Sequence, residues 1–151
     1  MTVKGLDRLG RKLTKTIPER VLVRVREAMK RSAGEAVAII RSLAPEDSGA
    51  LKDSIGWTWG DAPKGTIAIM TSKRSTGGMR ITIYAGGDDA YYARFVEFGT
   101  APHANKGKFA GTQNPGMPPQ PFFYPGWRLV SRKAKRRVTG AIRKAIKEGS
   151  A

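Results

Sequence analysis

The chain has 151 residues, of which 40% are hydrophobic and 26% are charged, and this composition is typical of one globular domain rather than a disordered segment. It contains no cysteine, which excludes a disulfide framework and thiolate chemistry. Its formal net charge of +16 is exceptional, because self-repulsion on that scale disfavours a compact monomer and usually implies a polyanionic partner.

The excess positive charge lies at the two ends of the chain. Residues 1–43 carry 11 lysines and arginines against 4 acidic residues, and residues 128–151 carry 9 against 1. Residues 44–127 are nearly neutral, with 8 against 7. Charges run through residues 1–15 without an apolar stretch, so we expect no signal peptide. No run approaches the roughly 20 apolar residues that span a bilayer.

Two helices are predicted before the first turn of the chain. Apolar residues spaced three or four apart predict a short amphipathic helix over residues 3–13, within an N-terminal helical arm at residues 1–17. The same spacing is stronger from Pro18 to Leu43, where one apolar stripe predicts a long helix. Pro18 suits the first turn of this helix, and the Ala44-Pro45 pair ends it.

Strand-like runs follow a turn at residues 45–49. Alternating apolar and polar residues predict three strands, at residues 54–59, 66–71 and 79–85. We expect an antiparallel meander with one buried face, with one turn at residues 73–78 inside it and another at residues 86–89 after it. The aromatic run YYARFVEF at residues 91–98 fits either a short helix or a strand.

The last third of the chain divides into a loop and a helix. Residues 99–120 are rich in Gly, Pro, Asn and Lys, and they predict an extended loop of a length that is usually functional or disordered. Residues 121–148 form the clearest helical pattern, with an apolar stripe from Trp127 onward and basic residues on the other faces. The predicted fold class is therefore α+β. It comprises a small antiparallel sheet of about three or four strands, packed by a long N-terminal helix and a long basic C-terminal helix, in a single domain at residues 18–151.

Residues suited to catalysis are few and isolated. His103 is the single histidine and lies in the predicted loop, without a cysteine or carboxylate at metal-ligand spacing. The adjacent Asp88 and Asp89 could hold a hard cation, yet two acids after Gly-Gly are more typical of a solvated turn. The chain contains no phosphate-binding loop and no dinucleotide fingerprint. We therefore expect no enzymatic activity, no cofactor and no metal site.

The basic C-terminal helix is the candidate contact with nucleic acid. No acidic residue occurs from 128 to 147, which favours phosphate attraction over a merely solvated helix whose long side chains cover its own apolar stripe. Basic residues without interleaved aromatic or amide side chains suit backbone phosphates better than base readout. The candidate phosphate-facing residues are Arg132, Lys133, Arg136, Arg137, Arg143 and Lys144.

Nine aromatic residues lie between residues 91 and 127, which is more than one small domain readily buries. We expect about half of them to anchor the core. The rest are expected to contact identical neighbouring copies or an adjoining ring-shaped assembly. Glu97 is a lone acid in an apolar run and is expected to pair with an arginine or a backbone N–H, since burying it unpaired would be costly. Gly99 is expected to supply a backbone angle that other residues resist.

Three motifs resemble those of the HK97 gp10-like phage proteins, and they occur in the order typical of that family. APEDSGALKDSI at residues 44–55 resembles A-P-x-D-[ST]-G-x-L-x-x-S-I, and YARFVEFGT at residues 92–100 resembles the family's most specific motif, YAxxVEFGT. PFFYP at residues 121–125 resembles the QPFLRPA that opens the family's last helix. The likeness spans about residues 18–148. The family often passes from FGT to PF in fewer residues, so the extra length at residues 101–120 is expected to form an arm that reaches a neighbour.

The resemblance implies an α+β tail-completion or head–tail joining protein, which forms a ring, expected to be a hexamer, at the head-proximal end of a long tail. The implied partners are identical copies, the tail terminator or tail tube, the head connector and the end of the packaged DNA, with no membrane. The implied location is the tail and neck of the virion, after synthesis in the cytoplasm of the bacterial host. The motif residues with an implied interface or structural role are Tyr92, Phe95, Glu97, Phe98, Gly99, Phe122 and Phe123.

Three other functions fit parts of the pattern. A free DNA-binding protein without sequence specificity would bind DNA tightly as a monomer. A tail terminator would cap the tail tube as a similar small ring. A nuclease would lose its activity when Asp88, Asp89, Glu97 or His103 is changed to alanine.

Overall fold

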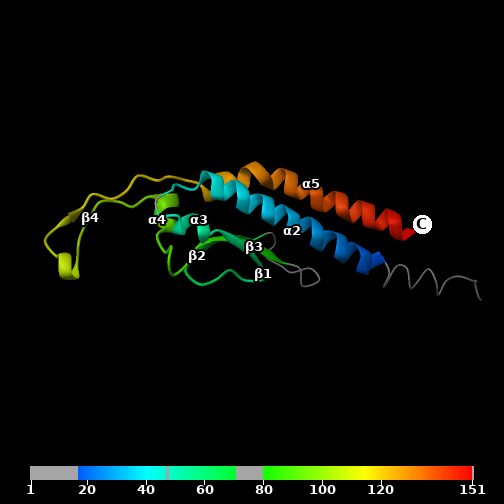
Figure 1. The fold of residues 1–151 in the computed structure, drawn as a ribbon, viewed down its shortest axis with the longest axis horizontal. Helices are drawn as coiled ribbons and strands as arrows, with labels where there is room; N and C mark the ends of the chain where they lie inside the picture. The colour runs from blue at the N-terminus through cyan, green and yellow to red at the C-terminus, as the bar shows by residue number, and fades with distance from the viewer. Residues whose placement is uncertain (1–16, 47, 71–79, 151) are drawn as a thin grey trace, which may run out of the picture.

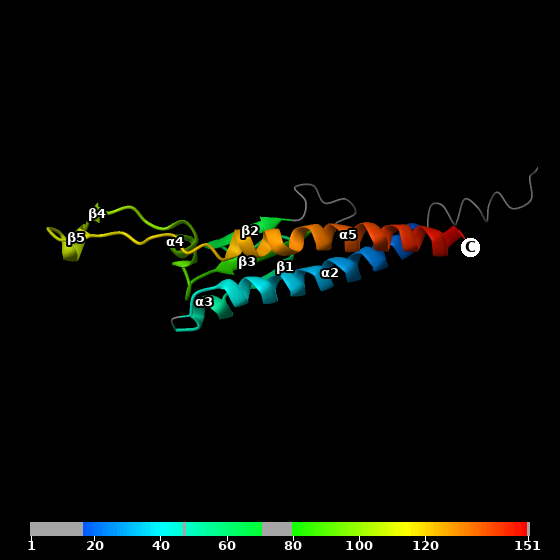
Figure 2. The ribbon, with the colours of Figure 1, turned by 90° about the horizontal axis from the view of Figure 1, so that it is seen from above.

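The computed structural model describes residues 17–46, 48–70 and 80–150. Two long helices lie side by side over one face of a small sheet, which confirms the predicted α+β class (Figure 1). A narrow hairpin projects beyond the sheet at one end of the molecule, and the carboxyl end of the last helix lies at the other (Figure 2). The predicted helix at residues 3–13 and the turn at residues 73–78 lie outside the described residues.

The two long helices are antiparallel and pack closely. α2 spans Ile17–Leu43 and α5 spans Phe123–Ser150, which confirms both predicted helices. A Cβ atom added at Gly126 of α5 would lie only 2.7 Å from Cγ1 of Ile40 in α2. The glycine therefore permits a close approach of the two helices where α5 begins.

The sheet has three antiparallel strands in the order β1-β3-β2. The strands are β1 Gly56–Trp59, β2 Thr66–Met70 and β3 Ile81–Gly86. The three predicted strands are confirmed, but the predicted meander is wrong, because β3 lies between β1 and β2 and pairs with both. β3 is buried along most of its length. Because it is the central strand, its buried backbone groups form hydrogen bonds with a neighbouring strand on each side. Residues 60–65 consequently return along the sheet, so that β2 starts beside the end of β3.

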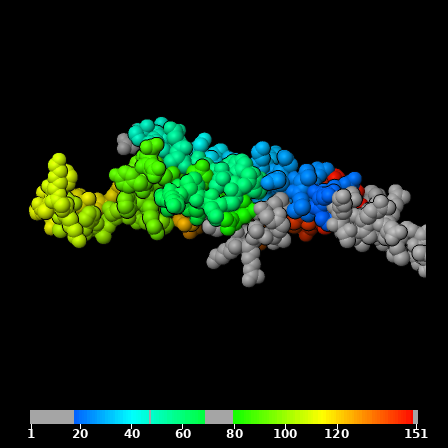
Figure 3. All heavy atoms as spheres, turned by 90° about the horizontal axis from the view of Figure 1, so that it is seen from below, coloured from blue at the N-terminus to red at the C-terminus, as the bar shows by residue number. Residues whose placement is uncertain are grey.

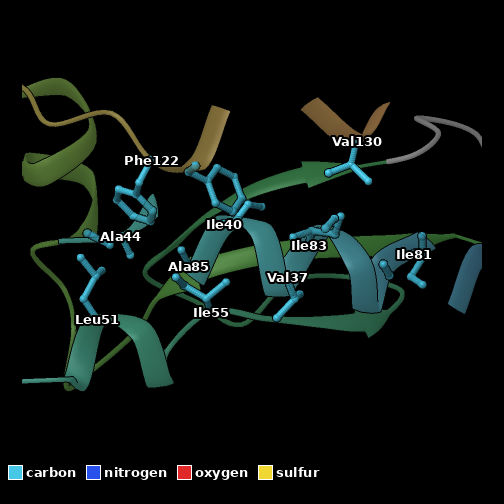
Figure 4. Close-up of a cluster of buried hydrophobic side chains, with 14 of the residues drawn as sticks. Val37, Ile40, Ala44, Leu51, Ile55, Ile81, Ile83, Ala85, Phe122 and Val130 are labelled. Atoms are coloured by element: carbon cyan, nitrogen blue, oxygen red, sulfur yellow. The ribbon is translucent and has the colours of Figure 1, made fainter. Parts of the chain in front are cut away.

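The core lies between the sheet and the helix pair (Figure 4). Ile81, Ile83 and Ala85 alternate along β3, and each is at most 1% exposed. Ile40 of α2 and Val130 of α5 pack in the same cluster and are as fully buried. Burying one such aliphatic side chain contributes about 1.5–3 kcal/mol, so this strip holds the two layers together.

Short elements occupy the end of the molecule away from the carboxyl terminus. α3 spans Ala50–Asp53, and α4 spans Ala93–Phe98, so the aromatic run that fitted a helix or a strand is helical. The predicted extended loop contains a small antiparallel hairpin with a 3₁₀ turn at its tip, Gly107–Phe109. Its strands are β4 His103–Ala104 and β5 Gln113–Asn114. We refer to residues 99–121 as the arm.

Candidate functional site

A buried carboxylate joins α4 to the start of α5. Glu97 is only 4% exposed. Its Oε2 accepts hydrogen bonds from the backbone N–H groups of Phe122 (2.7 Å) and Phe123 (2.9 Å), and its Oε1 accepts one from Tyr124 (3.1 Å). The first N–H groups of a helix have no partner within it, and a negative charge is favourable there. Of the two partners expected for Glu97, backbone N–H groups are the ones observed.

Gly99 lets the two halves of the arm meet directly after α4. Its φ is +71°, and an added Cβ would lie 2.7 Å from the carbonyl oxygen of Met117 and 2.8 Å from the nitrogen of Pro119. The neighbouring Thr100 and Met117 exchange both backbone hydrogen bonds, at 2.9 and 3.0 Å. The positive φ is the special backbone angle expected from the sequence, and the lack of room for a side chain is an additional finding. Glu97 and Gly99 together hold the base of the arm.

The aromatic residues of the motif region divide into two groups. Phe122 and Phe123 are fully buried in the core, so they serve packing and present no ring to a partner. Phe95 and Phe98 are 45% and 56% exposed on α4, and Tyr91 just before it is 69% exposed. The end of the molecule that carries the arm thus presents several aromatic rings to its surroundings.

The arm itself stands clear of the body (Figure 3). No residue from 99 to 121 is buried, although the segment is paired at its base and again between β4 and β5. Phe109 in the tip is 65% exposed and is flanked by Lys106 and Lys108, which are exposed as well. From the sequence, Phe109 is only one of the nine aromatic residues between 91 and 127, without assignment to the core or to a tip.

A cavity of about 720 Å³ opens at the base of the arm. Three segments meet around it, the turn before α3, the start of α4 and the two strands leaving the arm base. Tyr92, Phe95, Leu51 and Met117 contribute most of its large apolar side chains. His103 also lines it, and His103 Nδ1 lies 3.1 Å from the carbonyl oxygen of Ala101.

Two of the six candidate phosphate-facing residues are engaged within the chain. Arg137 donates to Oε2 of Glu35 (2.7 Å) and to the hydroxyl of Ser32 (2.9 Å), and Lys133 donates to Oε1 of the same glutamate. Hydrogen bonds from Lys133 and Arg137 lower the pKa of Glu35 below its ordinary value. Arg137 lies at the contact with α2, and only 19% of its side chain is exposed. Its contact with phosphate stays a prediction.

The other candidates on α5 remain exposed to solvent. These residues are Arg132, Arg136, Arg143 and Lys144. Three more cations of this helix are exposed but were not among the six candidates, namely Arg128, Lys135 and Lys147. A step of four residues turns an α-helix by only about 40°, so Arg128, Arg132 and Arg136 share one exposed face. The same spacing in the sequence was the signal that could have found Arg128.

The residues considered for catalysis do not form a site in the described ranges. Asp88 and Asp89 are exposed in the turn before α4, and Glu97 is occupied by three N–H groups. Within residues 17–46, 48–70 and 80–150, no three His, Asp or Glu side chains converge as metal ligands would.

These features define an α+β protein in which a buried acid and a glycine anchor a projecting hairpin arm. The family model described as "Bacteriophage HK97-gp10, putative tail-component" matches residues 7–99, which is more than half of the chain. The chain therefore belongs to the HK97-gp10-like family and is a bacteriophage tail component of the virion. The match ends at Gly99, so it includes the VEFG corner and leaves most of the arm and all of α5 outside.

Neither a curated protein nor a solved structure matches the chain. In the part of the chain that the structure describes, no helix combines the length and the apolar character that crossing a bilayer requires.

Proposed function

We propose that this protein is the tail-completion subunit of a long-tailed phage. Copies made in the cytoplasm of the bacterial host would form a ring, expected to hold six subunits, between the tail and the head connector. The ring would bind the tail terminator or tail tube on one side and the connector on the other. Membership of a tail-component family supports this location.

The arm is the observation that carries the proposal. An isolated two-stranded hairpin is marginally stable in water, and here no residue from 99 to 121 is fully buried, with only Met117 at the arm base packed partly against the core. Such a segment gains its stabilising contacts from another molecule. A ring requires two different patches of one chain to meet, and the arm and the aromatic surface around α4 supply two such patches.

The exposed face of α5 supports a contact with the end of the packaged DNA. Arg128, Arg132, Arg136, Arg143 and Lys144 form no ion pair within the described residues, and such cations attract phosphate without reading sequence. The same face also favours the alternative of a free DNA-binding protein. In the ring, the repulsion among many positive charges is tolerable because the polyanion neutralises them.

Electron microscopy of particles made without this protein tests the proposal. We expect filled heads and separate full-length tails that fail to join. Tails of uncontrolled length would instead identify a tail terminator, and joined infectious particles would refute both roles. A purified chain that stays monomeric and binds naked DNA tightly at low salt would favour the free DNA-binding protein.

The same particles test the DNA contact separately. Complementation with Arg132→Gln plus Arg136→Gln should leave tail joining intact and lower the fraction of joined particles that retain DNA. The matched control is Lys30→Gln plus Arg31→Gln, which removes two exposed cations from α2. Equal DNA retention by both variants would contradict the DNA contact without contradicting the joining role.

A further inference from the structure

The tip of the arm presents an aromatic ring on an ordered turn. Thr112 donates from its hydroxyl to the carbonyl oxygen of Phe109 (2.7 Å), and the Asn105 side chain donates to that hydroxyl (2.8 Å). Phe109 is nevertheless 65% exposed. A large apolar side chain that projects into water from a hydrogen-bonded turn is typical of a residue that anchors an interface.

The cavity at the base of the arm is lined by apolar surface that is complementary to a side chain such as Phe109. Tyr92, Phe95 and Met117 offer it aromatic and thioether surface, and its volume of about 720 Å³ accommodates more than one side chain. Phe95 remains 45% exposed, so the chain itself leaves part of this apolar surface uncovered.

The tip cannot fill the cavity of its own chain. Phe109 at the tip lies nine positions after Thr100 at the arm base, a separation that spans about 30 Å when extended. Pairing of His103 with Asn114 keeps the two halves of the arm together and directs the tip away from the body (Figures 1 and 2). An occupant of the cavity therefore comes from another molecule.

Charge complementarity points to a second copy of this chain as that molecule. The arm carries Lys106 and Lys108 and no acidic residue. Asp88 and Asp89 are exposed in the turn that leads into Tyr92 at the cavity, and they form no ion pair within the described residues. Opposite charges on the two patches favour one register of docking and oppose contacts between like patches.

We infer that the tip of each arm docks in the arm-base cavity of the next copy. Phe109 enters between Tyr92 and Phe95, and the two lysines of the tip face Asp88 and Asp89. Because the donor patch and the receptor patch differ, the contact repeats head to tail and closes a ring when the rotation allows. This inference rests on the ring of the proposed function and names the contact that builds it.

Disulfide trapping tests the contact without background, because the chain has no cysteine. Ala110→Cys beside the tip and Gln120→Cys at the cavity, combined in one chain, keep Phe109 and the receptor rings intact. Oxidation should give a ladder of covalent oligomers on a non-reducing gel, for purified protein and for assembled tails. The control pair, Ala110→Cys with Leu129→Cys on the exposed side of α5, should give none.

Further substitutions in the trapping background test the named side chains. Phe109→Ala should lower the cross-linked fraction about tenfold, as for a central interface anchor. Lys106→Glu plus Lys108→Glu should lower it as well, and adding Asp88→Lys plus Asp89→Lys should restore it. Restoration by the reversed charges is a result that mere misfolding of the arm does not produce.

Light scattering on the unmodified chain separates the two proposals. A ring that forms without any cross-linked ladder, or a tip that traps only a tube or connector protein, overturns the docking and leaves the ring standing. A chain that stays monomeric and is missing from assembled tails overturns the ring and the docking together.

Discussion

Removal of the Glu97 carboxylate is expected to destabilise the protein strongly. The side chain accepts three backbone hydrogen bonds of 2.7, 2.9 and 3.1 Å while 4% exposed. A hydrogen bond to a charged group contributes about 1.5–3 kcal/mol, and a buried N–H left without a partner costs about 1–3 kcal/mol. Three bonds to one carboxylate are not additive, so we take the lower end of these ranges and expect Glu97→Ala to lose about 4 kcal/mol.

Glu97→Gln should lose about half as much, because its amide keeps one carbonyl oxygen that can accept two of the three bonds. For a protein of this size a loss of 4 kcal/mol lowers Tm by roughly 8–16 °C. Urea unfolding followed by circular dichroism and tryptophan fluorescence measures both variants. Asp53→Asn, an exposed acid on α3, is the control and should unfold like the unmodified protein.

The order of unfolding free energies among the unmodified protein, Glu97→Gln and Glu97→Ala tests this reasoning. If Glu97→Ala unfolds within about 1 kcal/mol of the unmodified protein, water or another acceptor satisfies the first N–H groups of α5, and the carboxylate does not hold the helix. If Glu97→Gln is as damaging as the alanine variant, charge rather than hydrogen-bond count decides the effect.

The helix pair yields two further predictions. Gly126→Ala should destabilise the protein by about 1–3 kcal/mol, because the added Cβ would press on Ile40. A Cβ added at Gly140 would meet nothing within 4 Å, so Gly140→Ala should stabilise the protein by about 0.5–1 kcal/mol. Chemical denaturation measures both changes in unfolding free energy, and changes of the same sign would contradict the close approach of the helices. Hydrogen bonds from Lys133 and then Arg137 to the Glu35 carboxylate keep its folded pKa below its unfolded value near 4.5. This stabilisation is present above pH 4.5 and is lost as the pH falls through the lowered folded pKa, so the difference in unfolding free energy between the unmodified protein and Glu35→Gln should shrink in that window. A difference that stays constant down to pH 2 would argue against the ion pair.

The two long helices and the three strands were determined by local pattern. Apolar spacing of three or four residues describes one face of a helix wherever that helix lies, and Pro18 and Pro45 mark the ends of α2 without help from distant residues. The VEFGT motif was also visible, with the need for a partner at Glu97 and for a special backbone angle at Gly99. Both requirements follow from the residue type and the residues next to it in the sequence.

Tertiary structure alone decided the rest, because the deciding partners are far apart along the chain. Alternation predicts that β3 is a strand but cannot place it between β1 and β2, since every antiparallel order preserves the same alternation. Glu97 accepts hydrogen bonds from backbone N–H groups 25 to 27 residues away along the chain. Arg137 pairs with Glu35, 102 residues away, so its guanidinium lies at the contact between the helices rather than on the exposed basic face. A charge in the sequence shows that a partner is needed, and only packing determines which partner lies within reach.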